Sequence, residues 1–172
     1  DSARHADLPL TLTGVLVESS NTGMSQFGER LSDEKRFDYM RAFGVGEVTE
    51  VDFPGESSGI LNDWRDWDNQ SSYATMFGQG VATTAIQIAS VYQAIGNNGI
   101  RMPVSLVESC TKPDGTKVSL APTEGRQVVS AQAADDTVTM LEQTYLKGWL
   151  ASKWNIPGFR VATKTGTAQV PD

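Results

Sequence analysis

Helix start and stop signals along the chain constrain its fold more than any other feature. Ser32 precedes two acidic residues and an apolar run that ends at Gly44, which is the pattern of a capped helix. A second helix is predicted over residues 84–97, where Asn-Asn-Gly closes an apolar repeat, and a third from Ser130 to about Gly148. Their predicted core faces are Ile88, Val91, Tyr92 and Ile95 in the second helix, and Ala134, Val138, Leu141 and Tyr145 in the third.

Shorter segments complete the predicted architecture. Residues 12–17 and 22–31 are predicted helices on either side of a polar break. Residues 104–110 and 117–120 flank an Asp-Gly pair, which favours a β-hairpin. A last strand is predicted over residues 159–169, after Pro-Gly. The expected fold class is therefore mixed α/β (α+β), with an antiparallel sheet flanked by helices.

Composition narrows the classes of function. A length of 172 residues with 39% hydrophobic residues suits one domain or part of one. The formal net charge of -7 argues against nucleic acid as a partner, because nucleic-acid binding draws on clustered Lys and Arg. Cys110 is the single cysteine and His5 the single histidine, so no Cys/His metal cluster can form. We expect no cofactor, no metal and no membrane span in these residues.

The sequence Lys164-Thr165-Gly166-Thr167 carries the sharpest chemical signal. A lysine ammonium can fix a substrate carboxylate by its charge, while the two hydroxyls add hydrogen bonds. Glycine lets the backbone approach a ligand, since it has no Cβ. The same four residues also suit an exposed polar strand with no function.

A second signal is Ser19-Ser20-Asn21, which lies in the polar break between the first two predicted helices. There a hydroxyl and an amide can both face a cleft. Ser20 or Asn21 could equally be the cap of the helix that follows. The pair of motifs is more specific than either alone, because Ser-x-Asn followed by Lys-Thr-Gly forms two thirds of the active-site set of penicillin-reactive serine enzymes, the third being Ser-x-x-Lys.

With these motifs in order, the chain resembles the transpeptidase domain of class B penicillin-binding proteins, in particular the cell-division type. The resemblance implies the penicillin-binding/β-lactamase-like fold and covers nearly the whole chain. It extends over the following stretches: residues 18–24, 43–46, 52–59, 77–84 and 158–169.

The resemblance also implies roles for individual residues. Ser19 would relay a proton to the leaving group, and Lys164 would supply positive potential near it. Asn21 would hold the amide of the bound peptide. Thr165 and Thr167 would bind the terminal carboxylate of a D-Ala-D-Ala stem peptide or of a β-lactam, and the Thr167 N–H would be an oxyanion-hole donor. The implied catalytic set is Ser19, Asn21 and Lys164, and the implied substrate-binding set is Ser20, Thr165, Gly166 and Thr167.

The nucleophile is missing from this pattern, because no Ser-x-x-Lys precedes Ser19. Two later matches, at residues 32–35 and 109–112, stand in the wrong order; the first is interpreted as a helix cap and the second as a strand end running into a turn. We therefore expect residues 1–172 to be part of a transpeptidase domain truncated at both ends, without the Ser-x-x-Lys segment and the strands after Lys-Thr-Gly. Alone, this piece is predicted to be inactive.

Two other kinds of site find little support. Gly78-Gln79-Gly80 resembles a phosphate-binding loop, but Thr83 stands where a dinucleotide fingerprint has its third glycine. Residues 45–69 are predicted to be an irregular loop, and their acids Asp63, Asp66 and Asp68 lack the glycine and glutamate of an EF-hand.

The resemblance gives expectations for the whole protein as well. Its partners would be peptidoglycan stem peptides, β-lactam antibiotics and division-complex proteins, at the extracytoplasmic face of a bacterial membrane to which the parent is anchored. The piece itself is expected to be soluble. Open sheet edges would be compatible with a homodimer or a swapped assembly. The alternatives are a β-lactamase or β-lactam sensor of the same fold, and a non-catalytic scaffold module.

Overall fold

The computed structural model describes residues 9–51, 53–120, 124–149, 151–154 and 156–167. The chain divides into two compact units, which are described separately. Unit 1 comprises Asp1–Phe37, Asn62–Val81 and Asp135–Asp172, and unit 2 comprises Asp38–Leu61 and Ala82–Ala134. The helices α3 (Asp33–Ala42) and α6 (Ala131–Lys147) contribute residues to both units.

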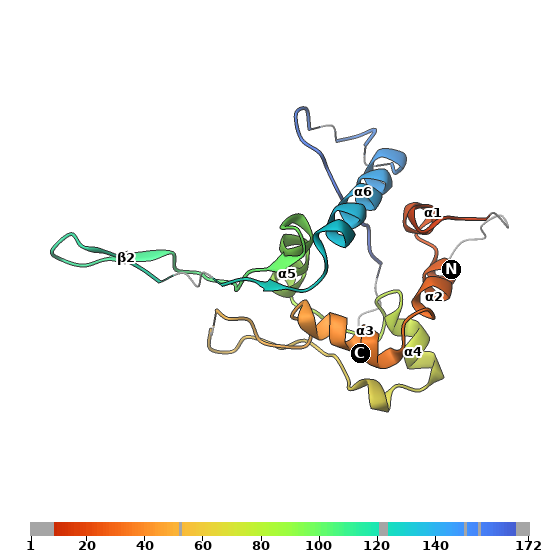
Figure 1. Cartoon of the computed structure of the whole chain (residues 1–172), viewed down its shortest axis with the longest axis horizontal. Helices are drawn as coiled ribbons and strands as arrows, with labels where there is room; N and C mark the ends of the chain where they lie inside the picture. Colours follow the sequence, from red (N-terminus) through yellow and green to blue (C-terminus); the bar gives the residue numbers. More distant parts are fainter. Residues whose placement is uncertain (1–8, 52, 121–123, 150, 155, 168–172) are drawn as a thin grey trace. The chain divides into compact units, whose positions relative to one another are not determined.

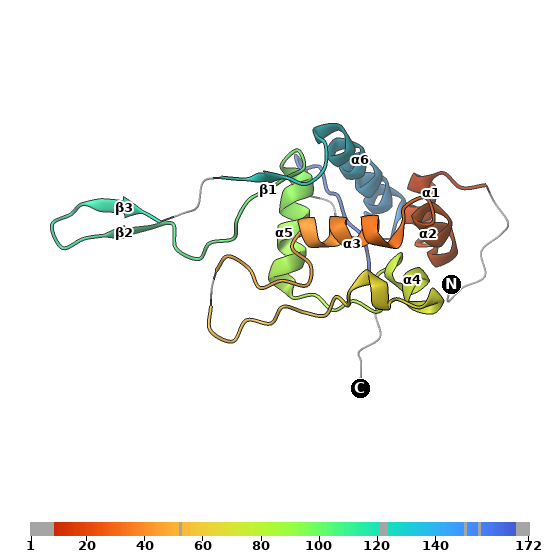
Figure 2. The ribbon, with the colours of Figure 1, turned by 60° about the horizontal axis from the view of Figure 1, so that its bottom comes forward.

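Unit 1 contains the short helices α1 (Leu12–Glu18), α2 (Asn21–Gly28) and α4 (Asn69–Thr75), together with the 3-10 turn η1 (Trp64–Asp66) and most of α6. Figures 1 and 2 show α1 and α2 side by side. Val15 of α1 is buried with 2% of its surface exposed, and Leu141 and Tyr145 of α6 are buried as well. The predicted inward face of α6 is thus confirmed at these two positions and at Ala134.

Unit 2 is built around α5 (Ala85–Gly96), which begins with the capping box of Thr84 and Gln87. The antiparallel pair of β1 (Ile100–Arg101) and β4 (Arg126–Gln127) follows α5 in the chain, and β1 lies against that helix. The predicted hairpin is confirmed as β2 (Ser109–Thr111) and β3 (Lys117–Ser119), which appears in Figure 1 as a long narrow ribbon, but its first strand begins at Ser109 and not at residue 104. The mixed helix and antiparallel-sheet class is confirmed.

The predicted core face of α5 is wrong at two positions. Ile88 is 42% exposed and Tyr92 is 41% exposed, whereas Gln87 is 1% exposed. The Gln87 amide donates to the carbonyl oxygens of Glu47 at 2.6 Å and Ser58 at 2.9 Å. The buried Gln87 amide needs these acceptors in the preceding loop, so a polar side chain lies where hydropathy predicts an apolar one.

The predicted strand over residues 159–169 is also wrong for residues 159–167, which are extended but pair with no strand among the described residues; residues 168 and 169 lie outside them. A strand is defined by ladder hydrogen bonds, and here Thr163 donates instead to the Leu141 carbonyl of α6 at 3.3 Å. The polar helix α4 and the two-residue strands β1 and β4 were not predicted, because they carry no apolar periodicity.

Candidate active site

The two serines of the first motif lie at the junction of α1 and α2 but have different surroundings. Ser19 ends α1 in the left-handed conformation, with φ 53° and ψ 41°, and its side chain is exposed. Ser20 is buried with 7% exposed, and its Oγ accepts from the Gly23 N–H at 3.1 Å as the cap of α2. The left-handed residue turns the chain between two helices within one position, at the energetic cost that a non-glycine residue has there.

Close packing of the two helices fixes this junction. A Cβ added to Gly23 of α2 would lie 2.7 Å from Cγ2 of the buried Val15 on α1. Only glycine permits this approach, because a side chain would have to displace a β-branched core residue. The position of Ser19 is therefore set by backbone geometry and by the contact of its two flanking helices.

Lys164 reaches Ser19 from a distant part of the sequence. Its Nζ donates to Ser19 Oγ at 2.8 Å and to the Thr165 carbonyl oxygen at 2.9 Å. Partial burial lowers the pKa of the Lys164 ammonium below its ordinary value, because the charged form loses hydration. The contact joins the two sequence motifs and places a cation directly beside a serine hydroxyl.

Contacts with α6 hold the extended segment that carries Lys164. The Thr163 N–H donates to the Leu141 carbonyl at 3.3 Å, and the Thr144 hydroxyl lies in hydrogen-bond contact with the carbonyls of both Leu141 and Thr163. Four residues before Lys164, the Arg160 guanidinium makes two bonds to the Glu142 carboxylate, at 2.5 and 2.8 Å. We refer to these contacts as the α6 tether.

A small pocket of about 80 Å³ lies beside Lys164. It is bounded by α1, by the end of α6 and by the motif segment, so all its walls belong to unit 1. The lining residues are Leu16, Val17, Thr144, Gly148, Trp149, Thr163, Lys164 and Thr165. The space is small, which suits a side group or solvent better than a whole peptide.

The remaining predicted residues are arranged differently. Asn21 is the first residue of α2 and is exposed, and Thr165, Gly166 and Thr167 are exposed on the extended segment. The structure therefore brings Ser19 and Lys164 together, and it gives Ser20 a capping role. The α6 tether escaped prediction from sequence, because Glu142 and Arg160 stand 18 positions apart and no local pattern links them.

The two later Ser-x-x-Lys matches have structural roles. The Oγ of Ser32 accepts from the Lys35 N–H at 3.2 Å, which is the bond of a helix cap. Ser109 begins β2, and Lys112 lies in the turn of the same hairpin, where its N–H donates to the Thr116 carbonyl at 2.9 Å.

The loop acids likewise have local partners. Asp63 caps η1 and pairs with Arg65, and the Asp68 Oδ1 accepts from the Ser71 N–H at 2.7 Å as the cap of α4. Within the described ranges, no three His, Cys, Asp or Glu side chains are grouped as metal ligands. No helix in the described part of the chain is both long and apolar enough to cross a bilayer.

Comparison with known proteins supplies the family context. Residues 2–172 match the family described as penicillin binding protein transpeptidase domain. The chain is 34% identical over 175 residues to the penicillin-binding protein PbpB of Mycobacterium tuberculosis and 36% identical over 169 residues to the peptidoglycan D,D-transpeptidase FtsI of Escherichia coli K12. These alignments cover 98% of the chain but only 26% and 27% of the two relatives, so the chain spans about a quarter of their length.

Solved structures agree with this result. A peptidoglycan synthetase from Bifidobacterium adolescentis matches with a TM-score of 0.93 and 29% identity, over the whole of this chain and 31% of that one. Penicillin-binding protein 3 of Mycobacterium tuberculosis, solved in complex with aztreonam, matches with a TM-score of 0.79 and 32% identity, over 94% of this chain and 35% of that one. The same family is therefore found by sequence and by structure.

Proposed function

Because this chain belongs to the penicillin-binding protein transpeptidase family, we propose that the protein containing it is a serine D,D-transpeptidase that cross-links peptidoglycan stem peptides. The observation that carries the proposal is the 2.8 Å hydrogen bond from Lys164 Nζ to Ser19 Oγ, which unites two motifs 145 positions apart. A cation beside a hydroxyl suits proton transfer in acyl transfer, since the charge stabilises the deprotonated oxygen.

The chemistry runs in two steps, both of which use the motif residues. A serine nucleophile attacks the carbonyl of the penultimate D-Ala, and the terminal D-Ala leaves with a proton that Ser19 relays. The amine of a second stem peptide then attacks the acyl-enzyme ester and releases the serine. Asn21 and the Lys164 charge orient the peptide, while Thr165, Gly166 and Thr167 form the carboxylate and oxyanion site, with Ser20 supporting the junction beside them.

The nucleophile itself is proposed to come from another part of the whole protein. This fits the absence of a Ser-x-x-Lys before Ser19 in the sequence and the roles of Ser32 as a cap and of Ser109 in a hairpin. The 172 residues would then supply one wall of the site as part of a transpeptidase domain. We further propose that the whole protein acts at the extracytoplasmic face of the membrane, where its substrate lies, with β-lactams as inhibitors and division proteins as partners.

Acylation by a labelled penicillin tests this function. The full-length protein should form one stable covalent adduct, whereas Lys164→Met and Ser19→Ala should form it far more slowly. The 172-residue chain alone should form none, because it lacks the attacking serine. Absence of an adduct on the full-length protein would exclude the proposal, and rapid release of hydrolysed penicillin would assign a β-lactamase in its place.

A further inference from the structure

Arg36 is a buried cation outside the candidate site. Only 7% of this α3 residue is exposed, which is unusual for a charged side chain. Burying a cation is costly unless it is paired and hydrogen-bonded, so its contacts must account for its presence. The function proposed above leaves this residue without a role.

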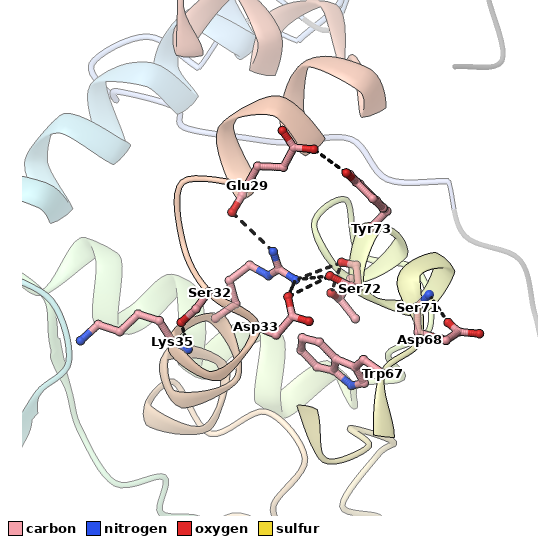
Figure 3. Close-up of polar contacts among 12 residues, drawn as sticks. Glu29, Ser32, Asp33, Lys35, Trp67, Asp68, Ser71, Ser72 and Tyr73 are labelled. Carbon is pink, nitrogen blue, oxygen red and sulfur yellow. Dashed lines mark hydrogen bonds and ion pairs between the residues drawn. The ribbon is translucent and has the colours of Figure 1, made fainter. Parts of the chain in front are cut away.

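The contacts of Arg36 join α3 to α4. Its Nη2 donates to Asp33 Oδ1 at 2.5 Å, to Ser72 Oγ at 2.9 Å and to the Ser72 carbonyl at 3.2 Å. The Ser72 hydroxyl donates in turn to Asp33 at 2.8 Å, and the guanidinium lies 5.7 Å from the ring centroid of Trp67. Figure 3 shows Asp33 and Ser72 facing one another, with Trp67 beside them.

One contact of Arg36 extends to α2, the helix that carries the first motif. Nη1 donates to the carbonyl oxygen of Gly28, the last residue of α2, at 3.4 Å. Carbonyls at a helix end carry partial negative charge and lack partners within the helix, so they favour a cation there. The buried Nε has no hydrogen-bond partner among the described residues, so the hydrogen bonds that orient the guanidinium all come from its Nη atoms.

Two further contacts hold the same end of α2 against α4. The Tyr73 hydroxyl donates to the Glu29 carboxylate at 2.5 Å, as Figure 3 shows. A Cβ added to Gly28 would lie 2.6 Å from the sulfur of Met76, so backbone and side chain are in close contact. The end of α2 is therefore fixed by α4, directly through these contacts and indirectly through Arg36.

This anchoring matters because α2 is short. It has eight residues, none of which is buried, and an isolated helix of this length is unstable in water. Its other end carries Ser20 and Asn21, about 12 Å from Gly28 at 1.5 Å per residue. At that distance a tilt of about 5° displaces the motif end by about 1 Å, which is enough to spoil acyl-transfer geometry.

We propose that Arg36 is a positioning residue, which aligns the Ser19-Ser20-Asn21 motif by holding the far end of α2 against α4. This inference rests on the proposed transpeptidase function. It assigns to a buried cation, paired with the half-buried Asp33, a role in the geometry of the site, in addition to its contribution to stability. Arg36 acts through α2 and has no contact with substrate.

A variant that removes both charges separates positioning from stability. Arg36→Met in the full-length protein leaves Asp33 without its buried partner, so both the Tm and the acylation rate should fall, the rate on the order of tenfold to a hundredfold. Arg36→Met/Asp33→Asn removes the stranded charge, so the Tm should recover in part. The acylation rate should stay low, because Gly28 remains untethered. Recovery of the rate together with the Tm would overturn the proposal.

Two controls complete the experiment. Val45→Ala shortens a buried side chain in unit 2 and should lower the Tm with the acylation rate unchanged, which shows that lost stability alone does not slow acylation. Amide hydrogen exchange gives a readout that needs no activity: both Arg36 variants should exchange faster over residues 21–28, and Val45→Ala should not. Unchanged exchange over residues 21–28 would refute the positioning role, whether or not the protein reacts with penicillin. Failure of the wild-type protein to form a penicillin adduct would exclude the transpeptidase function and is a separate result.

Discussion

Ser19 is placed by two helices that meet within one residue of it, whereas Lys164 lies on an extended segment that is held by contacts with α6. On the first side, Ser20 caps α2 and Gly23 packs on Val15, so the contacts made at the junction itself lie within nine positions. On the second side, the α6 tether reaches back about 20 positions, from Thr163 to Leu141 and from Arg160 to Glu142. One half of the contact is thus encoded locally, and the other depends on tertiary packing.

This difference predicts how the two halves respond to change. At the helix junction the backbone turn itself is fixed by local conformation, so loss of a distant contact such as that of Arg36 acts on it only by tilting α2 as a whole. An extended segment that is not paired in a β-sheet has few backbone hydrogen bonds to fix its position. Removing one side-chain contact is therefore expected to displace it. Mutations in the α6 tether should therefore affect the position of Lys164 from a distance. Mutations at the α1–α2 junction should affect only the residues of the first motif.

Removal of the Lys164 charge is expected to have the largest effect. Lys164→Met should slow acylation of the full-length protein by labelled penicillin about 10³-fold, because the site loses its cation. The Tm should change little, since the side chain is partly exposed. An acylation rate within threefold of wild type would contradict the role assigned to the Ser19–Lys164 contact.

Ser19→Ala should slow the same reaction about 10²-fold by removing the proposed proton relay. Alanine is as strained as serine in the left-handed conformation, so stability should be nearly unchanged. Rapid-mixing kinetics should locate the loss in the acylation step, with affinity for the β-lactam retained. A loss confined to affinity would assign Ser19 to binding alone.

The α6 tether gives the third prediction. Glu142→Gln should slow acylation on the order of tenfold, because the bidentate bond to Arg160 is weakened and Lys164 moves away from Ser19. Arg65→Met breaks the exposed pair with Asp63 in the same unit and serves as the matched control. If the two variants are equally active, the motif segment does not depend on the tether.

The pH dependence of acylation provides a smaller effect. Burial disfavours the charged form of Lys164, so its pKa lies below the ordinary value of about 10.4. The charge is present below that pKa and is lost as the pH rises through it. The acylation rate should therefore fall at alkaline pH, to about half where the pH equals the pKa. Lys164→Arg should abolish this fall, and an unchanged midpoint in that variant would attribute the titration to another group.

Loss of the α2 cap should have the smallest effect on activity. Ser20→Ala is expected to reduce the free energy of unfolding by ~1 kcal/mol, and Ser20→Gly by only a few tenths, because glycine is tolerated at a helix cap. Chemical denaturation can measure both values. If Ser20→Ala slowed acylation as much as Ser19→Ala, Ser20 would have a direct role in substrate binding.

Sequence signals predicted the structure correctly where one side chain bonds to a backbone N–H group a few residues further along the chain. Ser32 and Ser130 cap α3 and α6 as expected, through bonds to the Lys35 and Ala133 N–H groups. Thr84 opens α5 in the same way. Each of these bonds spans three residues, so the pattern that predicts it lies entirely within the local sequence.

The sequence alone determined the helices other than α4, the hairpin and the two motifs, because caps, turns and apolar periodicity act over a few residues. It could not place residues 159–167, because an extended segment takes its partner from elsewhere in the fold, here from α6. Nor could it show that Gln87, in place of Ile88, faces the interior of unit 2, since this depends on loop carbonyls from residues far back in the sequence that accept from the Gln87 amide. The contact between Ser19 and Lys164 follows the same rule: each motif can be identified in the sequence, but only tertiary packing brings the two within hydrogen-bond distance.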